Sequence, residues 1–278
     1  MADRLYDDPS VYDVLQTPGT AREVDVIERV ERGHGGRRHR RDDPTTWFEP
    51  ACGTGRYLRV AARRGHPVLG CDSEPAMVAY AGRRLARALA AGSAAAEATD
   101  SPRTVTARLT VADMTDPQVV PRLGAASADL ALNPVNSIRH LTSDRAVLDH
   151  LTVVARILRP GGIYVVGISL EEGNWLGPDE DVWVGRRGRC RVRQVVNYLP
   201  PRDGGRPRRE VVLSHLVIER PRGVEHRDHR YVLRTYSRAQ WRRLVARSSL
   251  HHEVSLDASG RVLAGRRVPY QLEVLRAR

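Results

Sequence analysis

The sequence predicts an α/β fold with a doubly wound, mostly parallel sheet of seven strands and a small antiparallel β insertion after the fifth strand. Two patterns predict this architecture. Short apolar runs alternate with helical patterns over residues 45–172, and strand-like runs without intervening helices follow over residues 173–236. Alternating strands and helices are typical of a parallel sheet covered on both faces, whereas consecutive strands joined by turns are typical of an antiparallel meander.

Seven short segments are expected to supply the strands of the main sheet. They are Thr46–Glu49, Val68–Asp72, Val105–Ala112, Ala128–Asn133, Gly162–Ile168, His251–Leu256 and Tyr270–Leu275. Helices are predicted where apolar residues recur every three or four positions. We expect them over Gly55–Arg64, from a cap at Ser73 through Met77, Ala81, Leu85 and Ala88, from a cap at Ser143 to Leu158, and from the Ser237–Gln240 capping box to Ser248.

The insertion and the N-terminal segment complete the division of the chain. A helix over Ala21–Val30 precedes a glycine- and arginine-rich loop, Gly33–Pro44. The strands expected in the insertion are Asp181–Arg187, Arg189–Leu199, Glu210–Arg220 and His229–Tyr236. The predicted organisation is an N-terminal helical segment and loop (1–44), a ligand-binding core (45–172), the insertion as substrate cap or interface (173–236), and a C-terminal helix and strands that complete the core (237–278).

The basic composition does not by itself indicate nucleic-acid binding. The formal net charge is +12, yet all 45 basic residues are arginine and the chain contains no lysine. Abundant Ala, Arg, Gly and Val point to a GC-rich coding sequence, in which arginine fills the solvated positions that lysine would otherwise take. A polyanion-binding face is the alternative.

Neither a membrane span nor a secretion signal is expected. The sequence has no run of eighteen apolar residues, and its first residues, MADRLYDDPS, are acidic rather than apolar. The cysteines Cys52, Cys71 and Cys190 are scattered and odd in number, which does not fit a disulfide framework. We therefore expect a cytoplasmic protein.

The segment EPACGTG, Glu49 to Gly55, stands between a predicted strand and a predicted helix. Gly53 and Gly55 allow a sharp turn and the close approach of a ligand to the backbone. Open α/β sheets bind ligands at the carboxyl ends of their strands, so this loop suits a nucleotide-like cofactor. A dinucleotide is disfavoured, because Leu58 stands where the G-x-G-x-x-G fingerprint requires its third glycine.

Acidic residues end the next two predicted strands. Asp72 ends the second strand, where a carboxylate can accept hydrogen bonds from both hydroxyls of a ribose. Asp113 ends the third strand, in the segment VADM, where it can accept from an exocyclic amine. Each acid alone also fits a strand end that faces water. Three successive strand ends with suitable residues, however, indicate a nucleoside-containing cofactor.

Trp47 to Ala81, WFEPACGTGRYLRVAARRGHPVLGCDSEPAMVAYA, resembles the first two motifs of class I S-adenosylmethionine-dependent methyltransferases of the small-molecule type. VADM (111–114) is similar to their adenine-side motif, LRPGGIYVV (158–166) to the segment entering their fifth strand, and YVLRTYSRAQWRRLV (231–245) to their C-terminal helix region. The resemblance implies a Rossmann-like fold, S-adenosyl-L-methionine as cofactor, and methyl transfer to a nitrogen or oxygen of a small-molecule acceptor.

The resemblance also implies a cofactor site. Glu49 and the two glycines would surround the methionine part of the cofactor, Asp72 would hold the ribose, and Asp113 would accept from the adenine amine. Met77 and Met114 would pack near the adenine, with ordinary core packing as the alternative. The full expected set is Glu49, Ala51, Gly53, Gly55, Asp72, Ser73, Met77, Asp113, Met114 and Asn133.

The segment NPVNSIRHL, residues 133–141, follows the fourth strand and is expected to face the acceptor. Asn136 and His140 are the candidate catalytic residues, because an amide can orient an acceptor amine and an imidazole titrates near neutrality. Arg139 is a candidate substrate contact. The alternative is a polar loop that satisfies its own backbone, with a structural histidine.

NPVN is also similar to the N-P-P-aromatic motif of amino-group methyltransferases that act on nucleic acids. Here Val135 replaces the second proline, and Asn136 replaces the aromatic residue that would stack on a flipped base. A nucleic-acid substrate is therefore the alternative to a small molecule. A non-catalytic cofactor-binding protein of the same fold is a further alternative.

The insertion is expected to cap the acceptor pocket, and Trp175, Arg191 and Arg193 are its candidate substrate contacts. Alternation along CRVRQVVNY predicts that the two arginines lie on one face of a strand and Val192 on the other. An arginine-lined pocket would favour an acceptor that bears a carboxylate. Arginines that face water, with the meander as the interface of a homodimer, are the alternative.

No metal site is expected. His226 and His229 are three residues apart, a spacing that some metal ligands share. No cysteine or second histidine pair accompanies them at a useful distance, so both are assigned to a surface loop.

Overall fold

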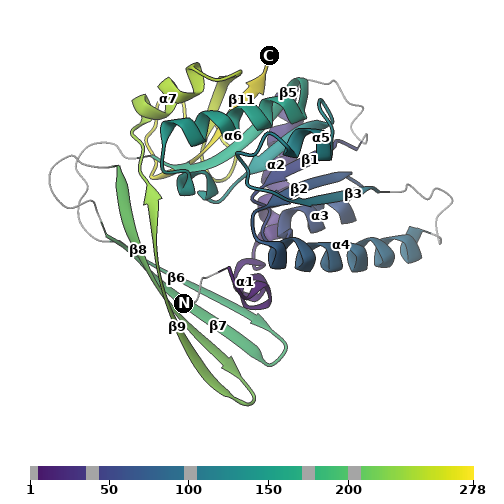
Figure 1. Cartoon of the computed structure of the whole chain (residues 1–278), viewed down its shortest axis with the longest axis vertical. Coiled ribbons are helices and arrows are strands. Elements are labelled where there is room, and N and C mark those ends of the chain that lie inside the picture. Colours follow the sequence, from purple (N-terminus) through teal and green to yellow (C-terminus); the bar gives the residue numbers. More distant parts are fainter. Residues whose placement is uncertain (1–5, 36–43, 97–104, 171–178, 200–207) are drawn as a thin grey trace.

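The computed structural model describes residues 6–35, 44–96, 105–170, 179–199 and 208–278 (Figure 1). Its main sheet has seven strands in the order β10-β11-β5-β4-β1-β2-β3. The strands are β1 (Trp47–Pro50), β2 (Val68–Asp72), β3 (Ala107–Val111), β4 (Ala128–Asn133), β5 (Leu158–Ser169), β10 (Leu250–Leu256) and β11 (Tyr270–Ala277). Strand β11 runs opposite to the other six strands, so the prediction of a mostly parallel, seven-stranded sheet is confirmed.

Helices cover both faces of this sheet. The alternation within β1 shows the two layers, because Trp47 packs in the core cluster formed with α2, α3 and α4, and Phe48 packs in the cluster formed with α5, α6 and α7. These helices are α2 (Thr20–His34), α3 (Arg56–Arg63), α4 (Pro75–Ala96), α5 (Val119–Leu123), α6 (Asp144–Ile157) and α7 (Arg238–Ala246). Within the described part of the chain, no helix is long and apolar enough to cross a membrane.

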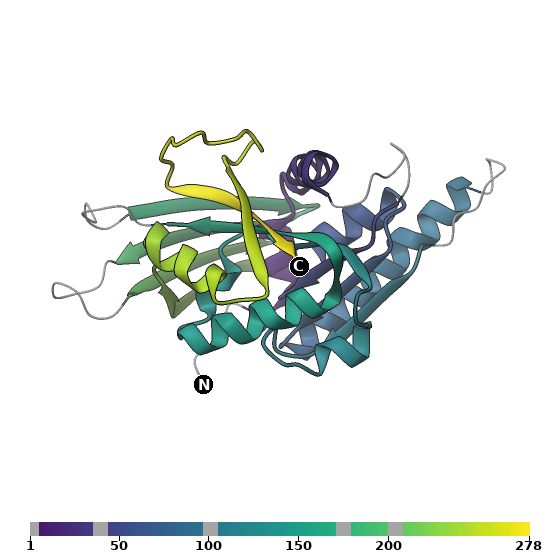
Figure 2. The same cartoon turned by 90° about the horizontal axis from the view of Figure 1, so that it is seen from above.

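The insertion forms a second, antiparallel sheet that extends from one side of the core (Figures 1 and 2). Its strands follow the chain in order: β6 (Asp179–Arg187), β7 (Cys190–Leu199), β8 (Arg209–Arg220) and β9 (Gly223–Arg234). This confirms the predicted meander. The fourth strand starts six residues earlier than expected, because the turn is placed at Pro221–Arg222 and the chain pairs from Gly223 onward.

The early start of β9 corrects the assignment of His226 and His229 to a surface loop. Both lie within the strand, and their odd spacing puts them on opposite faces, with His226 exposed and His229 buried. His226 lies beside His215, with 3.1 Å between Nδ1 and Nε2 of the two rings. Among the described residues, no cluster of His, Cys, Asp and Glu could hold a metal ion.

Helix α1 (Pro9–Gln16) was not expected from the sequence. The Asp8 carboxylate caps it by accepting from the backbone N–H groups of Ser10 and Val11, and Pro9 occupies its first turn. Its apolar side, Val11, Val14 and Leu15, packs on the inner face of the four-stranded sheet. The Asp-Pro pair was the available signal, but eight residues carry little helical periodicity.

A buried ion pair ties the insertion to the core. Arg139 lies in the 3-10 turn η1 (Ser137–His140), which follows β4, and its guanidinium binds the carboxylate of Glu210 on β8. Arg139 Nε also donates to the carbonyl oxygen of Arg234, at 2.8 Å. Both charged side chains are buried and have lost their hydration. Each is stabilised instead by the opposite charge of the other.

We predict that Glu210→Ala destabilises the protein by about 3–5 kcal/mol, because it leaves the Arg139 guanidinium buried without its counter-charge. The midpoint of urea-induced unfolding measures the change. The control is Asp149→Ala, which removes the partner of Arg145 in an exposed i,i+4 pair on α6 and should cost at most about 0.5 kcal/mol. Equal shifts in the two variants would contradict a structural role for the buried pair.

Candidate active site

The loop between β1 and α3 turns through three residues with left-handed backbone. Ala51, Gly53 and Gly55 have φ angles of 54°, 52° and 67°. At Gly55 the space is also limited, since a Cβ would lie 3.1 Å from the Cβ of Ala81 on α4. The glycines therefore permit both the turn and the close packing of α3 against α4. The expected loop is present, at the carboxyl end of β1.

Glu49 lies on β1, just before this loop, and is buried. Its Oε2 has no hydrogen-bond partner among the described residues. Burial raises the pKa of Glu49 well above its ordinary value, and the nearby Asp72 adds to the rise while Arg56 opposes it. A buried carboxylate with an open acceptor position fits a bound ammonium group, which would supply the missing hydrogen bond and counter-charge. The methionine part of S-adenosylmethionine carries such a group.

Asp72, at the end of β2, holds the glycine loop. Its Oδ2 accepts from the backbone N–H of Gly53 at 2.7 Å, and its Oδ1 accepts from that of Glu74 at 3.0 Å. Burial raises the pKa of Asp72, against the effect of these two donors. Each carboxylate oxygen keeps a further acceptor position, so both remain able to bind hydroxyls.

Ser73 and Met77 follow Asp72. Helix α4 begins at Pro75, so Ser73 lies too early to cap it, and this expectation was wrong; the serine is exposed. The Met77 side chain is only 1% exposed, which fits the core-packing alternative.

Asp113 lies two residues after the end of β3, and its charge contributes to the raised pKa of Asp72 on β2. Its Oδ1 accepts from the backbone N–H and the hydroxyl of Thr115, at 2.8 and 2.6 Å. The carboxylate is exposed, whereas the following Met114 is buried. Glu49, Gly53, Asp72 and Asp113 are thus brought to one edge of the sheet, as the strand-end positions predict.

His150 on α6 supports this edge and was missed by the sequence reasoning. Its Nδ1 lies 3.1 Å from the carbonyl oxygen of Met114, and its Nε2 lies 2.8 Å from the Tyr164 hydroxyl. Because a carbonyl oxygen only accepts, Nδ1 carries the proton and Nε2 accepts from Tyr164. Burial lowers the pKa of His150 to about 4, so the neutral ring holds the segment that carries Asp113 and Met114.

The two asparagines of the NPVN segment bind the protein itself. Asn133 donates to the carbonyl oxygen of Pro50 and accepts from the N–H of Ile138, both at 3.1 Å. Asn136 donates to the hydroxyl of Ser169 at 3.1 Å and accepts from its N–H at 2.7 Å. Asn136 has a φ of 54° and lines the adjacent cavity, but both ends of its amide are engaged. These contacts fit the alternative of a loop that satisfies its own backbone.

A cavity of about 1070 Å³ lies between this loop, α1 and the inner face of the four-stranded sheet. His140 lines it, stacked on Tyr231 with 5.7 Å between ring centroids. The hydroxyl of Tyr6 lies 3.2 Å from His140 Nε2. Desolvation lowers the pKa of His140, and the charge of Arg139 adds to this effect, so the imidazole is neutral at neutral pH. Burial raises the pKa of Tyr6 well above its ordinary value, so its hydroxyl keeps its proton.

The described lining of the cavity is aromatic and, on balance, acidic. Its seven aromatic residues are Tyr6, Tyr12, Tyr57, Trp183, Tyr198, Tyr231 and Tyr270. Its four carboxylates, Glu23, Asp179, Asp181 and Glu210, outnumber its two guanidinium groups, Arg139 and Arg267. Sequence reasoning missed the tyrosines, because no motif distinguishes them from core residues.

Of the predicted substrate contacts in the insertion, the two arginines lie elsewhere. Arg191 and Arg193 share one face of β7 and Val192 lies on the other, as the alternation predicts, but the arginines are on the exposed face. Arg191 pairs with Glu219 across that surface, at 3.7 Å. The inner face, which carries Gln194, lines the cavity instead. The expectation that Arg191 and Arg193 line the acceptor pocket was therefore wrong. Trp175 lies outside the described residues.

Comparison with known proteins adds to this geometry. Residues 48–166 match the family model described as a methyltransferase domain. No curated protein sequence matches the chain. Solved structures do match in fold. The sugar N-methyltransferase KedS8 from Streptoalloteichus sp ATCC 53650 is 22% identical, with a TM-score of 0.68 over 100% of this chain and 96% of that one.

Two further structures share the fold over nearly the whole chain. DesVI from Streptomyces venezuelae is 20% identical, with a TM-score of 0.67 over 94% of this chain and 92% of that one. CalS10 from Micromonospora echinaspora, an amino pentose methyltransferase, is 17% identical, with a TM-score of 0.62 over 92% and 90% of the two chains. Residues 48–166 thus match a methyltransferase domain, and the chain as a whole shares the fold of these three solved structures.

Proposed function

We propose that this enzyme methylates an amino group of a small, polar, sugar-like acceptor bound in the cavity beside His140. The observation that carries the proposal is the lining of that cavity, in which the described residues include seven aromatic rings and more carboxylates than guanidinium groups. Glu210 is paired with Arg139 and Glu23 with Arg56, so the negative charge that remains belongs to the exposed carboxylates of Asp179 and Asp181. These two carboxylates favour a cationic acceptor over an acidic one. This replaces the carboxylate-bearing acceptor that an arginine-lined pocket would have favoured.

The cofactor side is assigned to residues at the strand ends. Glu49 would accept from the ammonium of the methionine part, Asp72 would accept from the ribose hydroxyls, and Asp113 would accept from the adenine amine. S-adenosylmethionine supplies an electrophilic methyl group on its sulfonium. The protein must then align the acceptor with that group and exclude water.

An acceptor amine that binds as an ammonium ion must lose a proton before its nitrogen lone pair can attack the methyl group. His140 is the proposed base, because its imidazole is neutral and lines the cavity. The Tyr6 hydroxyl lies 3.2 Å from His140 Nε2, where it can donate to an unprotonated Nε2 or accept from a protonated one. The contact with Tyr6 therefore stabilises both protonation states of the ring.

The aromatic residues suit the body of a sugar. Tyr198 and Tyr231 line the cavity from β7 and β9, and Trp183 lines it from β6. Aromatic rings offer apolar faces for the C–H groups of a sugar, and tyrosine adds a hydroxyl for its polar groups. KedS8 is a sugar N-methyltransferase and CalS10 is an amino pentose methyltransferase, which supports the same acceptor class.

A nucleic-acid acceptor is the second candidate, and two contacts speak against it. The Asn136 side chain is engaged with Ser169, and Val135, beside it, offers no aromatic ring for a flipped base. The deciding experiment offers labelled S-adenosylmethionine with D-glucosamine, D-galactosamine, their N-acetyl derivatives, or duplex DNA and RNA. We expect labelled methyl on free amino sugars and none on N-acetyl sugars. Methylated nucleic acid, bound with a steep salt dependence, would reverse the assignment.

We predict that Asp72→Ala weakens binding of S-adenosylhomocysteine by about 1–3 kcal/mol, through loss of charge-assisted hydrogen bonds to the ribose. Titration calorimetry on the folded protein measures the change. Asp116→Ala, in the turn before α5, is the matched control and should leave the affinity unchanged. Unaltered binding in Asp72→Ala would remove Asp72 from the cofactor site.

We predict that His140→Gln lowers kcat about 100-fold or more while cofactor affinity stays constant. In the wild-type enzyme, the rate should fall only at a pH below the ordinary histidine pKa of 6.5, because the pKa of His140 is lowered from that value and the ring becomes protonated there. His140→Gln should lack this acidic limb, whereas titration of the acceptor amine at higher pH should persist. An unchanged acidic limb in the variant would assign the base to another group.

A further inference from the structure

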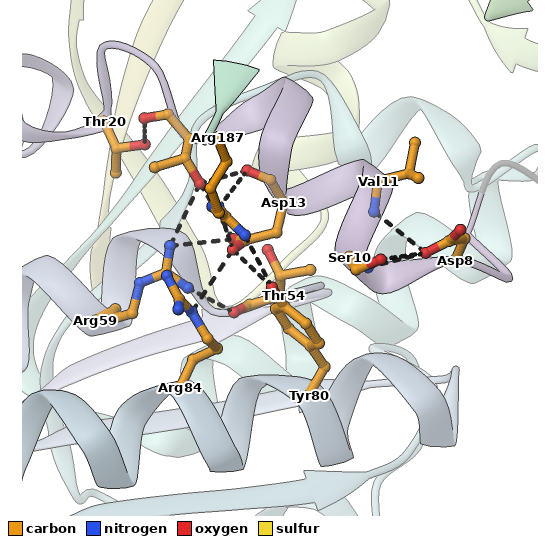
Figure 3. A network of polar contacts seen from close by, with 11 residues as sticks. Asp8, Ser10, Val11, Asp13, Thr20, Thr54, Arg59, Tyr80, Arg84 and Arg187 are labelled. Carbon is orange, nitrogen blue, oxygen red and sulfur yellow. Dashed lines mark hydrogen bonds and ion pairs between the residues drawn. The ribbon is translucent and has the colours of Figure 1, made fainter. Parts of the chain in front are cut away.

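Asp13 of α1 is fully buried, and side chains from three other elements meet at its carboxylate (Figure 3). Oδ1 accepts from Arg59 Nη2 at 3.0 Å. Oδ2 accepts from Arg187 Nη2 at 2.7 Å and from the Tyr80 hydroxyl at 3.0 Å. Arg59 comes from α3, Tyr80 from α4 and Arg187 from β6, so one carboxylate joins the methyltransferase core and the insertion to α1.

The cluster also reaches the cofactor loop. Arg59 Nη1 lies 3.4 Å from the carbonyl oxygen of Thr54, between the two glycines of that loop. Arg187 Nη1 donates to Tyr80 at 3.1 Å, which closes the contact between β6 and α4. The Asp13 carboxylate is therefore linked through one residue to the glycine loop and directly to the insertion.

The charges at this point bind α1 firmly. Burial alone would raise the pKa of Asp13, but the guanidinium groups of Arg59 and Arg187 hold it below its ordinary value. Asp13 is consequently ionised at neutral pH. Arg84 contributes a further cation, with its Nε 3.7 Å from Oδ2. Without Asp13, several guanidinium groups would remain close together with no counter-charge, which is strongly unfavourable in a buried site.

The position of α1 decides where two tyrosines lie. Tyr12 on α1 lies against the glycine loop, with its Cε1 3.5 Å from the point that a Cβ on Gly53 would occupy. Tyr6, just before α1, packs on Tyr12 with 5.7 Å between ring centroids and reaches His140 Nε2. Both rings also line the acceptor cavity, so α1 places Tyr12 at the border between the glycine loop and that cavity.

Close backbone packing provides a second, uncharged constraint on α1. Gly185 lies inside β6, where a Cβ would overlap the carbonyl oxygen of Val14 on α1. A glycine in a strand interior often marks such an approach of two backbones. Helix α1 therefore sits directly on β6 and cannot keep this position if residue 185 carries a side chain.

We propose that Asp13 is a positioning residue for methyl transfer: it fixes α1 so that Tyr12 closes the methionine end of the cofactor site and Tyr6 meets His140. The inference rests on the proposed function, because it takes the glycine loop as the binding place of the methionine part. Helix α1 would then contribute to cofactor binding, in addition to packing its apolar side on the four-stranded sheet.

The test compares binding of S-adenosylhomocysteine with binding of 5′-methylthioadenosine, which lacks the amino-acid part. In Asp13→Asn, α1 should lose amide hydrogen-exchange protection over residues 10–16, and affinity for S-adenosylhomocysteine should fall about tenfold. Affinity for 5′-methylthioadenosine should stay within about twofold. The control is Asp25→Asn, which removes an exposed ion pair with Arg64 and should change neither ligand.

Gly185→Ala tests the same idea without altering a charge, and it stays informative if Asp13→Asn fails to fold. It should reproduce the selective loss of S-adenosylhomocysteine affinity, whereas Gly82→Ala, at a position in α4 with open space, should not. Equal loss for both ligands, or faster exchange in α1 with unchanged affinities, would overturn the inference. Failure of the wild-type protein to bind S-adenosylhomocysteine would instead refute the proposed function.

Discussion

The hydrogen bond from the Gly53 N–H to the Asp72 carboxylate joins the ends of β1 and β2, and the arrangement of the site depends on it. This hydrogen bond holds the glycine loop at the edge of the sheet, where α3 begins. The loop can take this course because its residues accept left-handed φ angles. Glu49 and Asp72 then lie together in a buried region, each with a raised pKa.

The core could be predicted from the sequence because its signals are local. The central strands of the parallel sheet are short apolar runs, and the acids at strand ends share one edge as a consequence of parallel topology. The insertion was also predictable, since turn residues separate its strands. Its fourth strand was placed six residues late, because polar residues 223–228 alternate too weakly to distinguish a strand edge from a loop.

What the sequence could not supply is the orientation of the insertion. Alternation along β7 separates Arg191 and Arg193 from Val192 and Gln194, but it does not say which set faces the core. That choice follows from α1, whose apolar side covers Val192 on the inner face. The contact joins residues about 180 positions apart, and helix α1 is itself too short to be recognised by periodicity. The acceptor-facing residues were therefore misassigned although the strand was correct.

The four-stranded sheet also separates two kinds of surface along every strand. In β7, Gln194, Val196 and Tyr198 contact the cavity, while the intervening positions belong to the outer face. Since side chains alternate strictly, a change at every second position remodels one surface and leaves the other as it was. Enzymes with this fold could change their acceptor specificity through substitutions at the cavity-facing positions alone. The solubility and contacts of the outer row would be inherited unchanged.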